Sequence, residues 1–233
     1  MRRAKRLLAI VGIGFGLLMP GEMASADPGT VPPGQLPTLT GEWWQWAYSF
    51  PNSQNPLNDA TGERCMFGQR GPIWFLAGNQ SAPRTCSVPE GVTLFFPLIN
   101  AVNFSTPEEC GNTTTLNLKQ LKASVAAFID PVPVHDLFAS VDGQPVKKNL
   151  IRRVQSEPFD VALPADNLCD FGPPPNPPSF VAPGIYAPAV DDGYYASLGP
   201  LTPGQHQIKF GSTFSGFFQD NTYNLTVVPV SLK

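Results

Sequence analysis

Short apolar runs separated by turn-forming residues recur along most of this chain. Two of them, residues 71–78 and 92–99, lack alternating polar positions, which predicts strands that are covered on both faces. Pro and Gly supply 27 and 21 of the 233 residues, and charged residues make up only 14%. This composition is typical of many short strands joined by tight turns. The chain is therefore predicted to be mainly β, an antiparallel β-sandwich of the immunoglobulin-like or jelly-roll type.

The second half of the chain has the most consistent β pattern. Residues 137–141 and 145–147 flank Asp142-Gly143, which predicts a hairpin with a tight turn. Further strands are expected over residues 152–156, 159–163, 194–198, 205–210 and 223–232. These would form the closing strands of the sandwich.

The first 26 residues have the features of a signal peptide. A basic segment (1–6) precedes an apolar one (7–18), and a small-x-small motif lies at 24–26. We expect a secreted or periplasmic protein without a membrane span. Its mature part would have a Pro-rich arm (27–40) and one domain (41–233). Cleavage would remove four basic residues and one acidic residue, changing the net charge from −3 to −6. This charge argues against nucleic acid as a partner.

Four cysteines lie in the predicted mature chain, and an even number in an exported protein indicates two disulfides. Three pairings are possible, and we expect Cys65–Cys86 and Cys110–Cys169. The first would join the two ends of the strand that contains Trp74. Zinc binding is the alternative, but the spacing lacks a CxxC or HxxxH motif, and no metal site is predicted here.

Two peripheral helices are expected, near residues 41–50 and 118–129. The first contains three of the four tryptophans. Trp43 and Trp46 share one helical face and should cover the apolar strands. Trp44 and Tyr48 form a second row and are the side chains of this helix expected to be exposed for ligand binding.

A second candidate site is the sequence Asp191, Asp192, Gly193, Tyr194 and Tyr195, which is expected to include a polar loop. Carboxylates beside aromatic rings are typical of sugar or calcium sites, so calcium is the one cofactor considered. His135, His206 and Asp192 are the candidate catalytic residues, as a general base and an acid. None of them belongs to a recognised catalytic motif.

Several runs together resemble a family of uncharacterised exported bacterial proteins. They are WWQWAYSFP, GPIWFLAG, CSVPEGVTLFFPLIN, DDGYYASLGPLTPGQHQIKFGSTF and a terminal YNLTV. The resemblance covers most of the mature chain and implies export and a β-rich fold, but no activity or catalytic residue. The segment LTPGQHQIKF also resembles the closing strands of extracellular immunoglobulin-like modules.

These observations favour a non-catalytic binding or surface-associated module, with a polysaccharide or cell-envelope polymer as its partner. One alternative is a secreted hydrolase or lyase that acts on an extracellular polymer. Another is a structural or assembly protein that docks through its Trp-rich helix. The pattern leaves the oligomeric state open.

Overall fold

The structure is a computed structural model that describes residues 30–78, 83–105, 115–169, 181–214 and 218–230. It is mainly β, as predicted, and contains two five-stranded sheets and two α-helices. The first sheet has the order β1-β3-β8-β6, with β7 also paired to β8, and the second has the order β2-β10-β9-β4-β5. The strands are β1 (Ile73–Phe75), β2 (Arg84–Pro89), β3 (Thr93–Phe104), β4 (Leu137–Val141), β5 (Gln144–Pro145), β6 (Ile151–Gln155), β7 (Phe159–Leu163), β8 (Gly184–Leu198), β9 (Gly204–Ser212) and β10 (Gln219–Val228). The helices are α1 (Leu36–Tyr48) and α2 (Leu118–Ile129), with short 3-10 turns η1 (Pro33–Gln35), η2 (Asn52–Gln54), η3 (Pro56–Asn58), η4 (Val134–Asp136) and η5 (Lys148–Leu150).

The sheets are mixed, so the prediction of an antiparallel sandwich is wrong in this respect. β1 pairs with β3 in parallel, and β2 pairs with β10 in parallel. The chain leaves the first sheet after β1, adds β2 to the second sheet and returns as β3, which makes a direct hairpin impossible. β2 was not expected as a strand, although Cys86 and Val88 alternate with exposed Thr85 and Ser87. The inward Arg84 breaks the apolar pattern at its first position.

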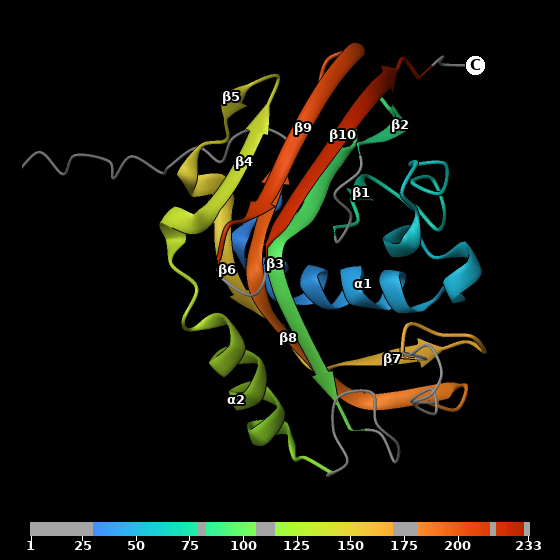
Figure 1. The fold of residues 1–233 in the computed structure, drawn as a ribbon, viewed down its shortest axis with the longest axis vertical. Helices are drawn as coiled ribbons and strands as arrows, with labels where there is room; N and C mark the ends of the chain where they lie inside the picture. Colours follow the sequence, from blue (N-terminus) through green and yellow to red (C-terminus); the bar gives the residue numbers. More distant parts are fainter. Residues whose placement is uncertain (1–29, 79–82, 106–114, 170–180, 215–217, 231–233) are drawn as a thin grey trace, which may run out of the picture.

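The first sheet is the central layer of the molecule. α1 covers one face, where Trp43 and Trp46 pack with Phe95, Val154 and Tyr195. The other face meets α2 at one end and the second sheet at the other. Figure 1 shows α1 and α2 on opposite sides of the long β3–β8 pair.

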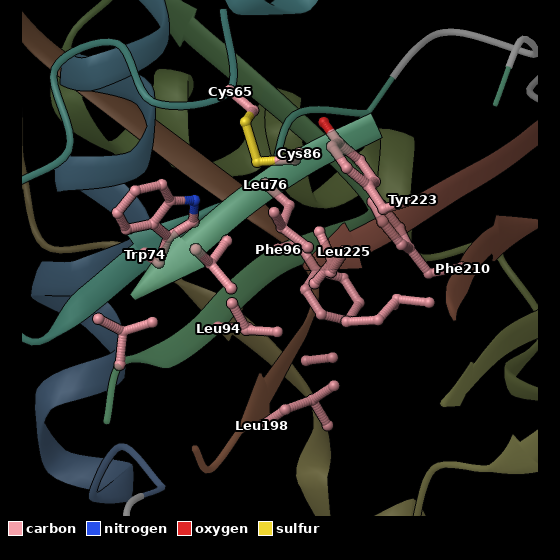
Figure 2. Packing of buried hydrophobic residues seen from close by; sticks show 14 of the residues in the cluster. Cys65, Trp74, Leu76, Cys86, Leu94, Phe96, Leu198, Phe210, Tyr223 and Leu225 are labelled. Atoms are coloured by element: carbon pink, nitrogen blue, oxygen red, sulfur yellow. A yellow bond between two sulfur atoms is a disulfide. The ribbon is translucent and has the colours of Figure 1, made fainter. Parts of the chain in front are cut away.

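The largest core cluster lies between the two sheets. Phe96 and Leu94 from β3 meet Phe210 from β9 and Leu225 from β10, and all four side chains are almost completely buried. Figure 2 shows these side chains in contact, with the Cys65–Cys86 disulfide at one margin. That disulfide is as predicted. Cys169 is buried, but Cys110 lies outside the described residues, so the second disulfide stays a prediction.

Both predicted helices are present, although the first begins earlier than expected. α1 begins at Leu36 rather than near residue 41, so the expected arm over 27–40 is wrong from that point on. Leu36 and Leu39 are buried residues of the first turns of α1. Pro37 is tolerated because it lies in the first turn. α2 has the predicted bounds and a capping box between Asn117 and Gln120. Within the described residues, neither helix combines the length and apolar character that a membrane crossing requires.

The largest departure from expectation is β8. Residues 194–198 were predicted as a strand preceded by a loop, but β8 runs over Gly184–Leu198 and pairs with β3, β6 and β7. The Asp191–Tyr195 segment therefore lies in the middle of a central strand. Gly193 is needed there, because a Cβ atom would lie 2.6 Å from the Cβ atom of Asn100.

Candidate functional site

The alternation of β8 divides the predicted site into two sets of side chains. Asp191 and Tyr195 point towards α1, whereas Asp192 and Tyr194 point towards α2 and the second sheet. Consecutive side chains of a strand leave opposite faces of a sheet. The carboxylates of Asp191 and Asp192 therefore do not converge on one ion, as the calcium interpretation would require.

On the α1 face, Asp191 is the centre of a buried hydrogen-bond cluster. Its Oδ1 accepts from Trp44 Nε1 at 2.7 Å and from the Tyr195 hydroxyl at 2.8 Å. Asn100 donates to the same hydroxyl at 2.9 Å, and the main chain of Asp191 exchanges two bonds with Ser156. Burial raises the pKa of Asp191 well above its usual value, and the bonds from Trp44 and Tyr195 oppose that shift.

This cluster attaches α1 to the sheet and offers little surface to a ligand. Asp191 and Tyr195 are 0% and 1% exposed, and Tyr48 is also buried. Trp44 is half-buried and stacks on Tyr48, with their ring centroids 5.4 Å apart. The structure thus brings together four of the predicted ligand-binding residues, but places them in the interior.

On the opposite face, Asp192 is held by Arg153. The Nε and Nη2 atoms of Arg153 donate to the two carboxylate oxygens of Asp192, each at 3.0 Å. Arg153 also donates to Asp130, the residue that follows α2, at 2.7 Å. The bond to Asp192 raises the pKa of Arg153. Asp192 therefore has a clear structural role, which is to fix the end of α2 against β8 and β6.

The two histidines lie on different elements and contact different acidic residues. His135 is exposed in η4, with Nε2 3.5 Å from Asp136. His206 in β9 lies 2.7 Å from Asp142 through Nδ1 and 2.9 Å from the carbonyl oxygen of Thr202 through Nε2. The bond to Asp142 raises the pKa of His206. His206 therefore supports the turn of the β4–β5 hairpin, and both of its ring nitrogens are occupied.

A groove along the outer side of α1 is lined by both aromatic and polar side chains. Its main part has a volume of 650 Å³, and a neighbouring part of 330 Å³ shares the lining residues Glu42 and Ile73. We call the two parts together the α1 groove. It is lined by Val31, Gly34, Gln35, Thr38, Leu39, Glu42, Gln45, Trp46, Ser49, Phe50, Gly68, Arg70, Pro72, Ile73 and Phe75.

Aromatic rings form part of this groove, and polar groups surround them. The Trp46 ring lies 6.4 Å from Phe50 and 5.6 Å from Phe75 between ring centroids. Phe50 and Phe75 are half-buried, whereas Glu42, Gln45 and Arg70 are exposed. Trp46 is fixed by a 2.8 Å hydrogen bond from its Nε1 to the carbonyl oxygen of Phe67. The groove thus combines a rigid aromatic wall with side chains that can donate and accept hydrogen bonds.

Sequence reasoning missed the α1 groove, although part of its signal was present. Glu42, Gln45 and Ser49 recur at spacings of three and four, which places them on one side of the helix. Arg70 and Phe75 come from the segment before and within β1, and only the folded chain brings them next to α1.

Comparison with protein-family models, with curated proteins and with solved structures finds no match to this chain. Over the part of the chain that the structure describes, no group of three or more His, Cys, Asp or Glu side chains is arranged to hold a metal ion. The chemistry of the α1 groove is therefore inferred from its own side chains.

Proposed function

We propose that this protein is an exported, non-catalytic binding module that recognises a polysaccharide or cell-envelope polymer in the α1 groove. The observation that carries the proposal is the aromatic wall of Trp46, Phe50 and Phe75 beside the exposed groups of Glu42, Gln45 and Arg70. A sugar ring has apolar C–H faces that pack on aromatic rings, and its hydroxyl groups need donors and acceptors at the edges. The two connected parts of the groove suit an extended chain better than a single compact ligand.

The arrangement of the carboxylates favours binding over hydrolysis. Glycoside hydrolysis usually requires two carboxyl groups that face each other across the substrate. Glu42 is the one carboxylate among the described residues that line the α1 groove. Asp191 and Asp192 are buried and hydrogen-bonded to Trp44 and Arg153.

Two further observations support this proposal, and the first of them counts against the assembly alternative. Trp43 packs within the core and Trp44 is held inwards by its hydrogen bond to Asp191, so Trp46 is the one tryptophan of α1 that lines the α1 groove. The Cys65–Cys86 disulfide is compatible with an oxidising compartment outside the cytoplasm.

Affinity gel electrophoresis against a panel of soluble polysaccharides tests the proposal. The protein should be retarded by at least one polymer, and Glu42→Ala and Arg70→Ala should each weaken that retardation about tenfold, since hydrogen bonds to charged groups are worth roughly 1.5–3 kcal/mol. Both side chains are exposed, so the variants should fold normally. Lys119→Ala, an exposed change on α2, is the matched control and should bind like the parent protein.

Each result has a definite meaning. If no polymer in a broad panel retards the protein, the polysaccharide function is wrong. If a polymer binds equally well to both groove variants, the α1 groove is not the site. Depolymerisation of the bound polymer by the purified protein would contradict a non-catalytic role.

A further inference from the structure

A separate pocket opens where the edges of the two sheets meet. It has a volume of 760 Å³ and lies between β4 and β5 of the second sheet and β6 of the first. We call it the sheet-edge pocket. Figure 1 shows β4, β5 and β6 together at one side of the molecule. Its lining is Val134, His135, Leu137, Phe138, Ala139, Ser140, Pro145, Val146, Lys148, Ile151 and Tyr194.

The inner wall of this pocket is a continuation of the protein core. Leu137, Val146, Ile151 and Tyr194 are half-buried, and each packs against the core cluster between the sheets. A ligand placed against these side chains would cover apolar surface that the protein leaves partly open. Burial of such surface is favourable by roughly 25 cal/mol per Å². The wall therefore selects a ligand with a sizeable apolar part.

The rim of the pocket has the opposite character. Lys148 is exposed at the start of η5, and His135 is exposed in η4. They are the two ionisable cationic groups in a lining that contains no carboxylate among its described residues. Asp136 lies 3.5 Å from the Nε2 atom of His135 and offsets any positive charge on that ring. Lys148 is therefore the main positive charge of the rim. Although the chain has a net charge of −3, this rim should attract anions.

We propose that the sheet-edge pocket binds an amphiphilic carboxylate of the fatty-acid type. The hydrocarbon chain lies against Leu137, Ile151 and Tyr194, and the carboxylate lies at the rim near Lys148. A singly charged head suits this rim, because the described lining residues include no arginine to give the bidentate contacts typical of phosphate sites. The proposal is independent of the α1 groove and of any ligand bound there.

Calorimetric titration of the full protein with decanoate, below its micelle concentration, tests the proposal. Decanoate should saturate the protein with one-site behaviour and bind at least tenfold more tightly than 1-decanol or decyltrimethylammonium. Acetate, which has the head without the chain, should give no saturable heat. Lys148→Gln should weaken decanoate binding about fivefold to tenfold, whereas Lys119→Gln, an exposed change on α2, should leave it unchanged.

A second variant tests the apolar wall. Val146→Trp places a large ring in the pocket and should abolish decanoate binding. If that protein does not fold, Lys148→Gln still decides the outcome, because Lys148 is exposed and its loss should not disturb folding. The proposal is overturned if decanoate does not bind, if decanol or decyltrimethylammonium binds as tightly, or if Lys148→Gln binds like the parent protein.

Discussion

Arg84 offers the sharpest test of how this fold is stabilised. It begins β2 with only 1% of its surface exposed, and its guanidinium lies 5.3 Å from the ring centroid of Tyr223. Its Nε atom donates to the carbonyl oxygen of Asp59 at 2.7 Å, and Nη1 donates to the Tyr223 hydroxyl at 2.8 Å. The full set of acceptors is the carbonyl oxygens of Leu57, Asp59, Ala77 and Gly78 and the Tyr223 hydroxyl.

Arg84→Met keeps the apolar stem of this side chain but removes all five hydrogen bonds. The carbonyl of Ala77 still accepts from the Tyr223 hydroxyl at 2.9 Å, but those of Asp59 and Gly78 lose their Arg84 donor. Each buried group left without a partner costs about 1–3 kcal/mol. Loss of the cation–π contact adds about 1 kcal/mol, and relief of a buried charge offsets part of the total. We expect a net loss of about 3 kcal/mol.

Urea unfolding followed by tryptophan fluorescence measures this loss. With a slope of about 2 kcal/mol per M, the unfolding midpoint should fall by about 1.5 M. Arg84→Lys should lose about half as much, because an ammonium group reaches fewer of the acceptors. Arg152→Met, an exposed change in β6, is the matched control. A midpoint for Arg84→Met within about 0.3 M of the control would refute the reasoning.

Two further predictions concern pH and the disulfide. The hydrogen bond from His206 to the Asp142 carboxylate raises the pKa of His206, so the stabilisation by the protonated ring is present below its ordinary pKa of about 6.5 and is lost as the pH rises through the raised value. Asn tolerates the positive φ of residue 142, so Asp142→Asn should keep the turn intact. It should lower the melting temperature more near about pH 5.5 than near about pH 8.5. Equal losses at both pH values would rule out the charge interaction between Asp142 and His206. The Cys65–Cys86 disulfide closes a loop with a sequence separation of 21. Replacement of both cysteines by Ala should lower the free energy of unfolding in urea by about 3 kcal/mol. An unchanged unfolding midpoint would show that the disulfide does not stabilise the fold.

Several elements were predictable because their signals are local. α2 follows from an apolar stripe and an Asn117 cap, and the β4–β5 hairpin follows from Asp142-Gly143 between two apolar runs. The burial of Trp43 and Trp46 follows from their spacing beside strands without a polar face. The signals for α2 and for the β4–β5 hairpin each lie within one short continuous segment of the chain.

β8 could not be predicted in this way. Asp, Asp and Gly are disfavoured in strands, so residues 191–193 indicate a loop when they are considered alone. The folded chain accepts them because Trp44 and Tyr195 hydrogen-bond Asp191, and Arg153 pairs with Asp192. Trp44 and Arg153 are remote in sequence from β8 and lie on other elements, so no local pattern indicates them.

The sequence by itself determined the β-rich character, the two helices, the first disulfide and the apolar faces that had to be covered. Only the tertiary structure decided which aromatic side chains remained open to solvent. Trp44 and Tyr48 were turned inwards by Asp191 and Phe104, whereas Arg70 was brought beside Trp46 to complete the α1 groove. Periodicity shows that a residue shares a face with its neighbours. Whether that face is buried depends on strands and loops that arrive from elsewhere in the chain.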